Sequence, residues 1–207
     1  MYLPAHFRRD DPAALARLVA DHPLGMLVRQ GPRGLDADHI PFEAAEDGRV
    51  LRAHVARANP LWSEAREAEP VLVVFRGPQA YVSPNSYPSK AEHHRHVPTW
   101  NYEVVHVHGT LRIVDDARFV RALVARLTRE HEHRTDAARA WRMGDAPQDY
   151  IDGLLGAIVG IEVAVTRIEG KAKLGQNREE RDRLGAADAL EARGEGELAR
   201  AMRTAGS

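Results

Sequence analysis

The chain has 207 residues, with 29 Lys and Arg against 30 Asp and Glu, so its formal net charge is −1. This balance gives no general electrostatic attraction to nucleic acid or to anionic membranes, and the lack of cysteine excludes disulfides, thiolate catalysis and cysteine-based zinc sites. No apolar run approaches transmembrane length, and residues 1–12 lack the apolar segment of a signal peptide, so we expect a soluble cytoplasmic protein with no membrane contact.

The N-terminal quarter of the chain predicts one helix followed by three strands. Asp10 or Asp11 can cap the helix, and Pro12 fits its first turn. Pro23 ends the helix. Apolar runs separated by tight-turn residues predict strands at residues 24–30, 35–42 and 49–55.

The middle of the chain predicts a second helix and a buried strand. Asn59 can cap this helix, Pro60 fits its first position and Pro70 closes it. The continuous apolar run at residues 71–75 is typical of a strand that is buried on both faces. A Gly-Pro pair that begins at Gly77 is expected to end this strand in a turn.

The second half of the chain predicts two long strands and two helices. Residues 100–114 give the longest strand signal, and Gly109 within it is interpreted as a bulge or bend. Asp115 or Asp116 can cap the helix that follows. The remaining elements are a short helix at residues 149–155 and a strand at residues 158–168.

Six or seven strands in hairpin-like order argue against a parallel sheet, which needs long crossover connections. We therefore predict a mainly β fold with flanking helices (α+β), built as an antiparallel barrel. This domain is expected to span residues 1–170. Residues 171–207 change to a polar segment and a charged, Ala-rich stretch, which we interpret as a loosely attached helical tail.

A long connection at residues 80–102 is the most distinctive part of the sequence. It is rich in Pro, His and aromatic residues, and a compact domain seldom keeps so long a loop unless the loop binds something. Its side chains can stack on a ring, donate hydrogen bonds or hold a phosphate: Ser83, Tyr87, Lys90, His93, His94, His96, Trp100 and Asn101.

The histidines indicate a metal site only weakly. His106 and His108 are two residues apart on a predicted strand and so share a face, but the sequence places no cysteine or carboxylate between or beside them. His131 and His133 lie about 200° apart around a predicted helix and cannot easily chelate one ion. We expect no metal site.

Five blocks of sequence resemble the PaiB family, in the same order and with similar spacing. The blocks are HIPF at 39–42, HVARANPLW at 54–62, YVSPNSYPSK at 81–90, VPTWNYEVVHVHG at 97–109 and KLGQNR at 173–178. The resemblance covers nearly the whole chain, and the second and fourth blocks are the most specific. In the last block this chain has Gly175 where the family more often has Ser, which removes one possible hydroxyl donor.

This resemblance implies an FMN-binding split β-barrel related to the pyridoxamine-phosphate-oxidase-like flavoproteins. Proteins of that kind usually form homodimers and hold the flavin at the dimer interface. FMN needs an aromatic or apolar surface for its ring, donors for the ring edge and cations or hydroxyls for its phosphate. The residues that the resemblance places at such a site are His39, His54, Asn59, Tyr87, Lys90, Thr99, Trp100, Asn101, Lys173, Gln176 and Asn177.

Trp100 and Tyr87 are the candidates for stacking on the ring, and Lys90 and Lys173, with Arg57, for holding the phosphate. The structural alternative is that Trp100 is a core aromatic and the lysines are solvated. Asn59 has a structural explanation of its own as a helix cap.

The resemblance implies a negative transcriptional regulator in which the flavin is a sensor, and we assign no catalytic residue. The alternatives are a flavin-dependent oxidoreductase that uses the same site, and a haem-binding or haem-degrading relative with a histidine ligand. DNA binding is implied by the family description alone, because the sequence shows no helix-turn-helix and the Arg-rich tail carries nearly as many acidic residues.

Overall fold

The computed structural model of the chain describes residues 1–205. The strands in this range are β1 (Arg8–Arg9), β2 (Leu24–Gly31), β3 (Gly34–Pro41), β4 (Glu43–Ala44), β5 (Val50–Ala56), β6 (Glu69–Val82), β7 (Thr99–Val114) and β8 (Ile158–Lys173). The α-helices are α1 (Pro12–Asp21), α2 (Leu61–Glu64), α3 (Lys90–His93), α4 (Ala117–Asp136), α5 (Gln148–Gly156), α6 (Glu180–Glu191) and α7 (Gly196–Thr204). Short 3-10 helices are η1 (Ala5–Phe7), η2 (Pro84–Ser86), η3 (Ala137–Arg139) and η4 (Met143–Asp145).

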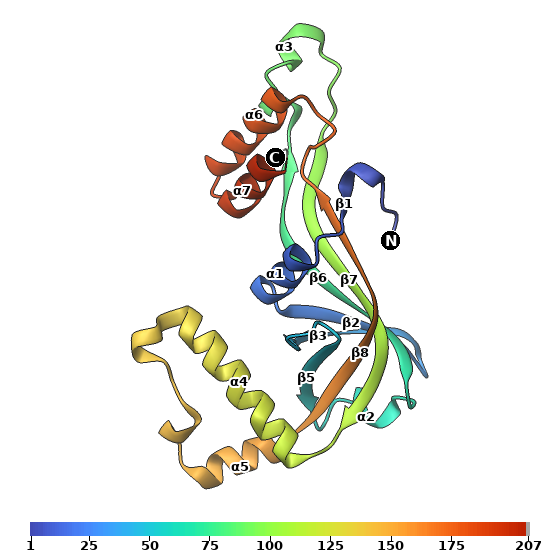
Figure 1. Ribbon diagram of the computed structural model, residues 1–207, viewed down its shortest axis with the longest axis vertical. Helices are drawn as coiled ribbons and strands as arrows, with labels where there is room; N and C mark the ends of the chain where they lie inside the picture. Colours follow the sequence, from blue (N-terminus) through green and yellow to red (C-terminus); the bar gives the residue numbers. More distant parts are fainter. Residues whose placement is uncertain (206–207) are drawn as a thin grey trace. The chain divides into compact units, whose positions relative to one another are not determined.

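In the described residues the strands form one eight-stranded sheet in the order β3-β2-β6-β7-β8-β5-β4, with β1 paired to β8 (Figure 1). The β2–β3 hairpin is antiparallel with Leu24 opposite Pro41, and β5 is antiparallel to β8 with Val50 opposite Ala164. The predicted mainly β fold with flanking helices is confirmed. The hydrogen-bonded order of this sheet is open, since it begins at β3 and ends at β4.

Side-chain caps start the helices where the sequence predicts them. Asp11 accepts hydrogen bonds from the amides two and three residues further on, at 3.1 and 3.2 Å, and Pro12 takes the first helical position. Asp116 accepts from the amide three residues on at 2.7 Å, and the Asn59 Oδ1 accepts from the amide two residues on at 2.8 Å. These bonds satisfy amides that the first helical turn leaves without partners.

The helix predicted to run from Asn59 to Pro70 is shorter than expected. It ends at Glu64, and Pro70 lies inside strand β6. The reason is tertiary, because the buried Glu69 carboxylate binds the Arg29 side chain at 3.0 Å and the Arg66 amide at 3.0 Å. Those contacts fix a turn at residues 66–69, at the point where propensity alone would continue the helix.

One prediction for the long strands is wrong, and another gains a second explanation. Strand β6 continues through Gly77 to Val82, so the expected turn there is absent from the described fold. Gly109 sits within the continuous strand β7, and a Cβ built on it would lie 2.4 Å from the carbonyl oxygen of Ala164 and 2.6 Å from Val163 Cγ1. Glycine is therefore needed there for the close approach of the neighbouring strand, and the predicted bulge or bend stays a prediction.

The chain divides into two compact units. The first unit comprises Met1–His22, Phe75–His106 and Glu169–Ser207, and the second comprises Pro23–Val74 and Val107–Ile168. Strands β6, β7 and β8 each contribute residues to both units. The fully buried side chains of the second unit include Leu27, Val73, Leu111, Leu123 and Ile161.

Helices α6 and α7 are part of the core of the first unit. Figure 1 shows α6 and α7 beside the upper part of β6. Leu190 of α6 and Met202 of α7 are both 1% exposed and pack in a cluster with Val82, Tyr87 and Leu174. The expectation of a loosely attached tail is therefore wrong, because small residues on both helices let their backbones approach the strands closely. Residues 206–207 of the predicted segment 171–207 lie outside the described residues.

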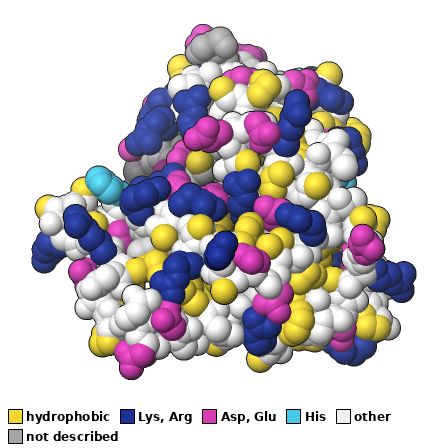
Figure 2. Space-filling model, turned by 60° about the horizontal axis from the view of Figure 1, so that its bottom comes forward, with side chains coloured by type: hydrophobic (Ala, Val, Ile, Leu, Met, Phe, Trp, Pro, Cys, Tyr) yellow, Lys and Arg dark blue, Asp and Glu magenta, His cyan; other side chains and the backbone are white. Residues whose placement is uncertain are grey.

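The surface carries acidic and basic side chains in mixture (Figure 2). In the second unit, Glu43 binds Arg126 at 2.6 Å and Glu162 binds Arg52 at 3.2 Å, which joins α4 and the strands through ion pairs. No helix in residues 1–205 combines the length and the apolar character that crossing a membrane requires.

Candidate functional site

The ends of β6, β7 and β8 in the first unit form a ribbon with two different faces. Side chains alternate along a strand, so residues two apart share a face. One face contributes to the core with α6 and α7 through Ala80, Val82, Ala172 and Leu174. The opposite face carries what we call the aromatic–lysine face, made of Tyr81, Trp100, Tyr102, Lys171 and Lys173.

The aromatic side of this face is open. Trp100 is 49% exposed and Tyr81 is 46% exposed, and their ring centroids lie 6.4 Å apart in an edge-to-face arrangement. The Trp100 Nε1 donates a hydrogen bond to Gln79 Oε1 at 3.1 Å, which fixes the orientation of the indole. Exposed aromatic rings held in one orientation give a ready surface for a flat ligand.

The lysine side of this face is positively charged. The Lys171 Nζ lies 5.4 Å from the Tyr102 ring centroid, and the Lys173 Nζ donates to Thr99 Oγ1 at 2.5 Å. Burial lowers the pKa of Lys173, and the neighbouring Lys171 and Arg178 add to this lowering. In the described residues neither lysine has a carboxylate partner at ion-pair distance, so the pair offers uncompensated charge to an anion.

The loop between β6 and β7 is fixed to α6 by a buried polar network. Both oxygens of Asp182 accept from Ser89, at 3.0 Å from its amide and 2.6 Å from its hydroxyl. The Ser89 Oγ also lies 2.7 Å from His96 Nε2, and the Arg178 guanidinium lies 2.9 Å from His96 Nδ1. Tyr87 packs beneath this group, with Arg178 4.7 Å above its ring.

This network does not activate Ser89 as a nucleophile. An arginine is always a donor, so His96 Nδ1 must accept, and in the neutral ring the proton is on Nε2. His96 then donates to Ser89 Oγ, while the Ser89 hydroxyl donates to Asp182. A histidine that already carries its proton on the serine side cannot take the proton of the hydroxyl, so the arrangement is an attachment of the loop.

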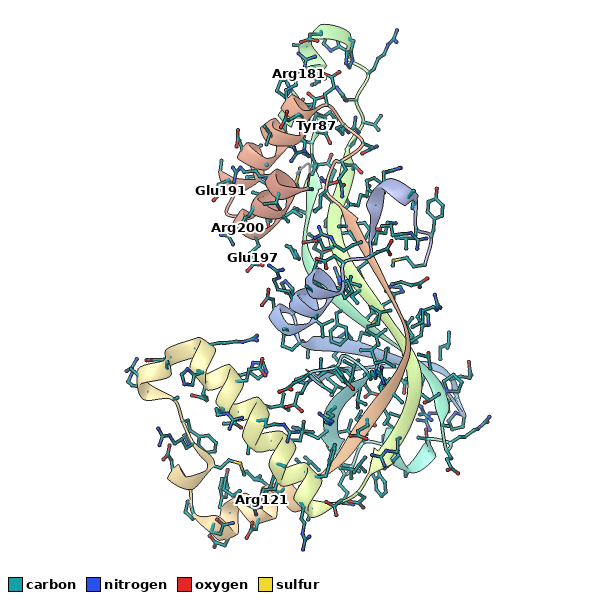
Figure 3. All side chains as sticks on the ribbon, in the orientation of Figure 1. Tyr87, Arg121, Arg181, Glu191, Glu197 and Arg200 are labelled. Atoms are coloured by element: carbon teal, nitrogen blue, oxygen red, sulfur yellow. The ribbon has the colours of Figure 1, made fainter. Side chains whose placement is uncertain are left out.

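A second contact holds the same loop. Arg181 in the first turn of α6 donates to both oxygens of Glu92 in α3, at 2.5 and 2.7 Å. Figure 3 shows Arg181 and Tyr87 together near the start of α6. Two groups of contacts therefore attach the long, Pro-rich connection between β6 and β7 to α6.

Lys90 and Tyr87, both predicted site residues, line a shallow hollow of about 470 Å³ beside α3. The Lys90 Nζ donates to Asn85 Oδ1. Burial raises the pKa of Tyr87, and its ring is covered by Arg178 and the neighbouring His96. Tyr87 is thus a packed residue at the floor of the loop.

Of three further predicted residues, one contacts the last turn of α7 and two lie in the turn that precedes α6. Asn101 is buried and its Nδ2 lies 3.5 Å from Met202 Sδ, on the face opposite Trp100. Gln176 closes a local turn by accepting from the Leu174 amide at 2.8 Å and donating to the Ala172 carbonyl. Asn177 is exposed.

The remaining predicted residues lie in the second unit. Asn59 caps α2 and donates to Asp38 Oδ1 at 2.8 Å. His39 is exposed on β3, and burial lowers the pKa of His54 on β5. Thr99, Trp100 and Lys173 therefore belong to the ribbon of the first unit, whereas His39, His54 and Asn59 belong to the second unit.

Sequence reasoning missed four side chains that shape this region, which are Tyr102, Lys171, Arg178 and Asp182. Lys171 and Lys173 share the i, i+2 spacing of one strand face, and that signal was available in the sequence. Asp182 gave no signal, because its partner Ser89 lies 93 residues away.

Comparison with known proteins gives a consistent set of relatives. A family model described as "Putative FMN-binding domain" matches residues 1–167. The chain is 30% identical to the protease synthase and sporulation protein PAI 2 of Bacillus subtilis, over 92% of this chain and 89% of that protein. It is 32% identical to an uncharacterised protein of Emericella nidulans, over 92% and 90%.

Solved structures share the fold at low sequence identity. A FAD and heme binding protein from Mycobacterium smegmatis matches with a TM-score of 0.58 at 18% identity, over 81% of this chain and 74% of that one. A flavocytochrome from Azotobacter vinelandii matches with a TM-score of 0.59 at 12% identity, over 82% and 70%. These likenesses agree with the split-barrel class that the sequence predicts.

Proposed function

The chain belongs to the PaiB-like family of FMN-binding domains, and from this premise we propose that it binds FMN on the aromatic–lysine face of the first unit. The observation that carries this proposal is the pairing of two lysines that have no carboxylate partner in the described residues with an exposed, oriented indole on the same face. A phosphate and a flat ring are the two parts of FMN that such a surface recognises.

The side chains present fit the cofactor. Lys171 and Lys173, with the Thr99 hydroxyl, supply the cations and the hydroxyl that a phosphate needs. Trp100 and Tyr81 supply the aromatic surface for the ring. Compared with the predicted site, this proposal keeps Thr99, Trp100 and Lys173, and it adds three neighbours that the fold brings beside them: Tyr81, Tyr102 and Lys171.

Other predicted residues take supporting roles in this proposal. Asn101 and Gln176 are already engaged with groups of the chain, so they hold α7 and the 174–176 turn in place. The network of Ser89 and Asp182 fixes the loop that leads into Thr99 and Trp100. These contacts set the positions of the binding side chains and do not touch the ligand.

A bound flavin would supply reversible one- or two-electron chemistry at its ring. The chain's own contribution is to bind the flavin and to hold a proton on Lys173. Lys173 has a lowered pKa beside two other cations, and a dianionic phosphate would stabilise its charged form and raise that pKa.

We further propose that the protein is a cytoplasmic homodimer in which the flavin lies at the interface and acts as a sensor for negative transcriptional regulation. The support for the dimer is the half-exposed pair Tyr81 and Trp100 on the aromatic–lysine face. The regulatory role rests on the similarity to a protein named for sporulation and protease synthesis. A DNA-binding surface is not assigned.

Two alternatives use the same fold. A flavin-dependent oxidoreductase would use the same face, and its flavin would be bleached by NAD(P)H and reoxidised in air. A haem protein is favoured by the likeness to a FAD and heme binding protein, and it would show a Soret band that is lost when one histidine is replaced.

The experiment that tests the proposed site is a titration with FMN and with riboflavin, which lacks the phosphate. Lys173→Met should weaken the binding of FMN about tenfold, because one charge-assisted hydrogen bond to the phosphate is lost. The affinity for riboflavin should stay within about twofold of the wild-type value. Trp100→Ala should weaken both ligands, and Arg200→Met on the exposed surface of α7 is the matched charge control. A larger loss of FMN in Lys90→Met than in Lys173→Met would move the phosphate to the hollow beside α3 and refute this site.

A further inference from the structure

A hollow of about 340 Å³ opens in the second unit between α4 and the segment that follows it. Figure 1 shows the chain leaving α4 and returning beside it to α5. The volume lies within the range of small-molecule sites. One face of α4 supplies Ala125, Thr128, Arg129 and His133, and the returning segment supplies Ala137, Ala140, Trp141, Arg142 and Met143.

The lining of this hollow carries positive side chains that form no ion pair in the described residues. Arg129 and Arg142 are always cationic, and His133 can become so. In residues 1–205, none of these three side chains has a carboxylate at ion-pair distance, and none of the lining residues is acidic. A site with two unpaired guanidinium groups favours an anion.

The acidic residues of the same stretch are engaged elsewhere. The Glu132 carboxylate accepts from the Trp141 amide at 2.9 Å, and the Asp145 carboxylate accepts from the Arg142 amide at 2.8 Å. The other two acids pair with arginines that do not line the hollow: Glu130 with Arg134 and Asp136 with Arg139. The carboxylates of Glu132 and Asp145 thus border the backbone of the lining, but in residues 1–205 neither forms an ion pair with Arg129 or Arg142, whose guanidinium groups are left to bind a ligand.

The anion that fits this hollow has a flat apolar body. Trp141 is 41% exposed, and the bond from its own amide to Glu132 fixes the backbone that presents it. Met143 and the lining alanines add apolar surface, and Thr128 adds a hydroxyl. We propose that this hollow binds a small aromatic acid, with its carboxylate held by Arg129 and Arg142 and its ring against Trp141.

The proposal is tested on the full chain with naphthalene-1-carboxylate as the probe and naphthalene-1-carboxamide as its uncharged isostere. Tryptophan fluorescence and calorimetry report binding. The carboxylate should bind saturably and about tenfold more tightly than the amide, since the amide loses the charge-assisted bonds. Equal binding of the two probes, or no saturable binding of either, would overturn the proposal.

Variants locate the bound probe. Arg129→Gln and Arg142→Gln should each weaken the carboxylate about fivefold to tenfold. Arg118→Gln removes the same charge from the exposed surface of the same helix, outside the lining, and should leave the affinity within twofold. Trp141→Phe should abolish most of the fluorescence quenching while binding persists by calorimetry. Quenching that survives in Trp141→Phe, or equal losses in Arg118→Gln and Arg129→Gln, would place the probe elsewhere.

Discussion

Replacing Ser89 by alanine tests the buried network that holds the β6–β7 loop on α6. Ser89 is 0% exposed and Asp182 is 1% exposed. The substitution removes the 2.6 Å hydroxyl bond to the Asp182 carboxylate and also the partner of His96 Nε2. The 3.0 Å bond from the backbone amide remains, so the variant removes only the two hydroxyl contacts, of which the bond to the buried Asp182 carboxylate is the charged one.

The expected loss of unfolding free energy is about 2 to 3 kcal/mol at neutral pH, because a hydrogen bond to a charged group contributes about 1.5–3 kcal/mol and the carboxylate stays buried. Burial alone would raise the pKa of Asp182, but the bonds from Ser89, with His96 and Arg181, outweigh it and lower the pKa. Stability from this carboxylate is therefore complete above its ordinary pKa of 3.8 and is lost as the pH falls through the lowered native value.

Urea unfolding followed by circular dichroism from neutral to acid pH measures this effect. Ser86→Ala is the matched control, since it makes the same change three residues earlier and should cost less than about 0.5 kcal/mol. The difference in unfolding free energy between Ser89→Ala and the wild type should be constant near neutral pH and become smaller at acid pH. If Ser89→Ala matches Ser86→Ala at neutral pH, the network does not stabilise the fold and the reasoning is wrong.

Three other experiments give direct tests. Gly109→Ala should lower the free energy of unfolding by about 1–3 kcal/mol, because its Cβ overpacks against Ala164. Gly153→Ala in helix α5, where a Cβ has nothing within 4 Å, should raise the free energy of unfolding by about 0.5–1 kcal/mol. Equal urea midpoints for the two variants would contradict this. Met202→Ala should cost about 2–5 kcal/mol and expose the 83–98 loop to proteolysis, while a loosely attached tail would show neither change. Burial raises the pKa of Glu103, although Arg9 opposes this shift. The contribution of this carboxyl to wild-type stability should therefore fall as the pH rises from 4.5 through the raised pKa. Glu103→Gln should remove this dependence of stability on pH.

Local chemistry accounts for what the sequence predicts well. The caps at Asp11 and Asp116 and the bond from Asn59 depend on contacts two or three residues away, so propensity reveals them. The strand at residues 100–114 was visible for the same reason, because its alternation is a property of the stretch itself. Local propensity does not predict where helix α2 ends. The segment after it is set by the contact of Glu69 with Arg29, 40 residues away in the sequence.

The candidate site was also predictable only in part. Trp100 and Lys173 could be named from their motif blocks, but the sequence did not tell that Trp100 would face solvent while Asn101 would turn inward to α7. That division depends on which ribbon face the C-terminal helices cover. The predicted contribution of His39 and His54 came from the family pattern and not from any local contact.

The division of the chain into two units sets an order for biosynthesis. The second unit ends at Ile168, so all of its residues are available before the C-terminal segment leaves the ribosome. The first unit is different, because its core includes Leu190 and Met202, the latter five residues from the end of the chain. Domains fold as their parts emerge during synthesis. The core of the first unit is therefore complete only after α7 has been synthesised, and a chain that lacks α7 lacks Leu198, Ala199 and Met202 from that core.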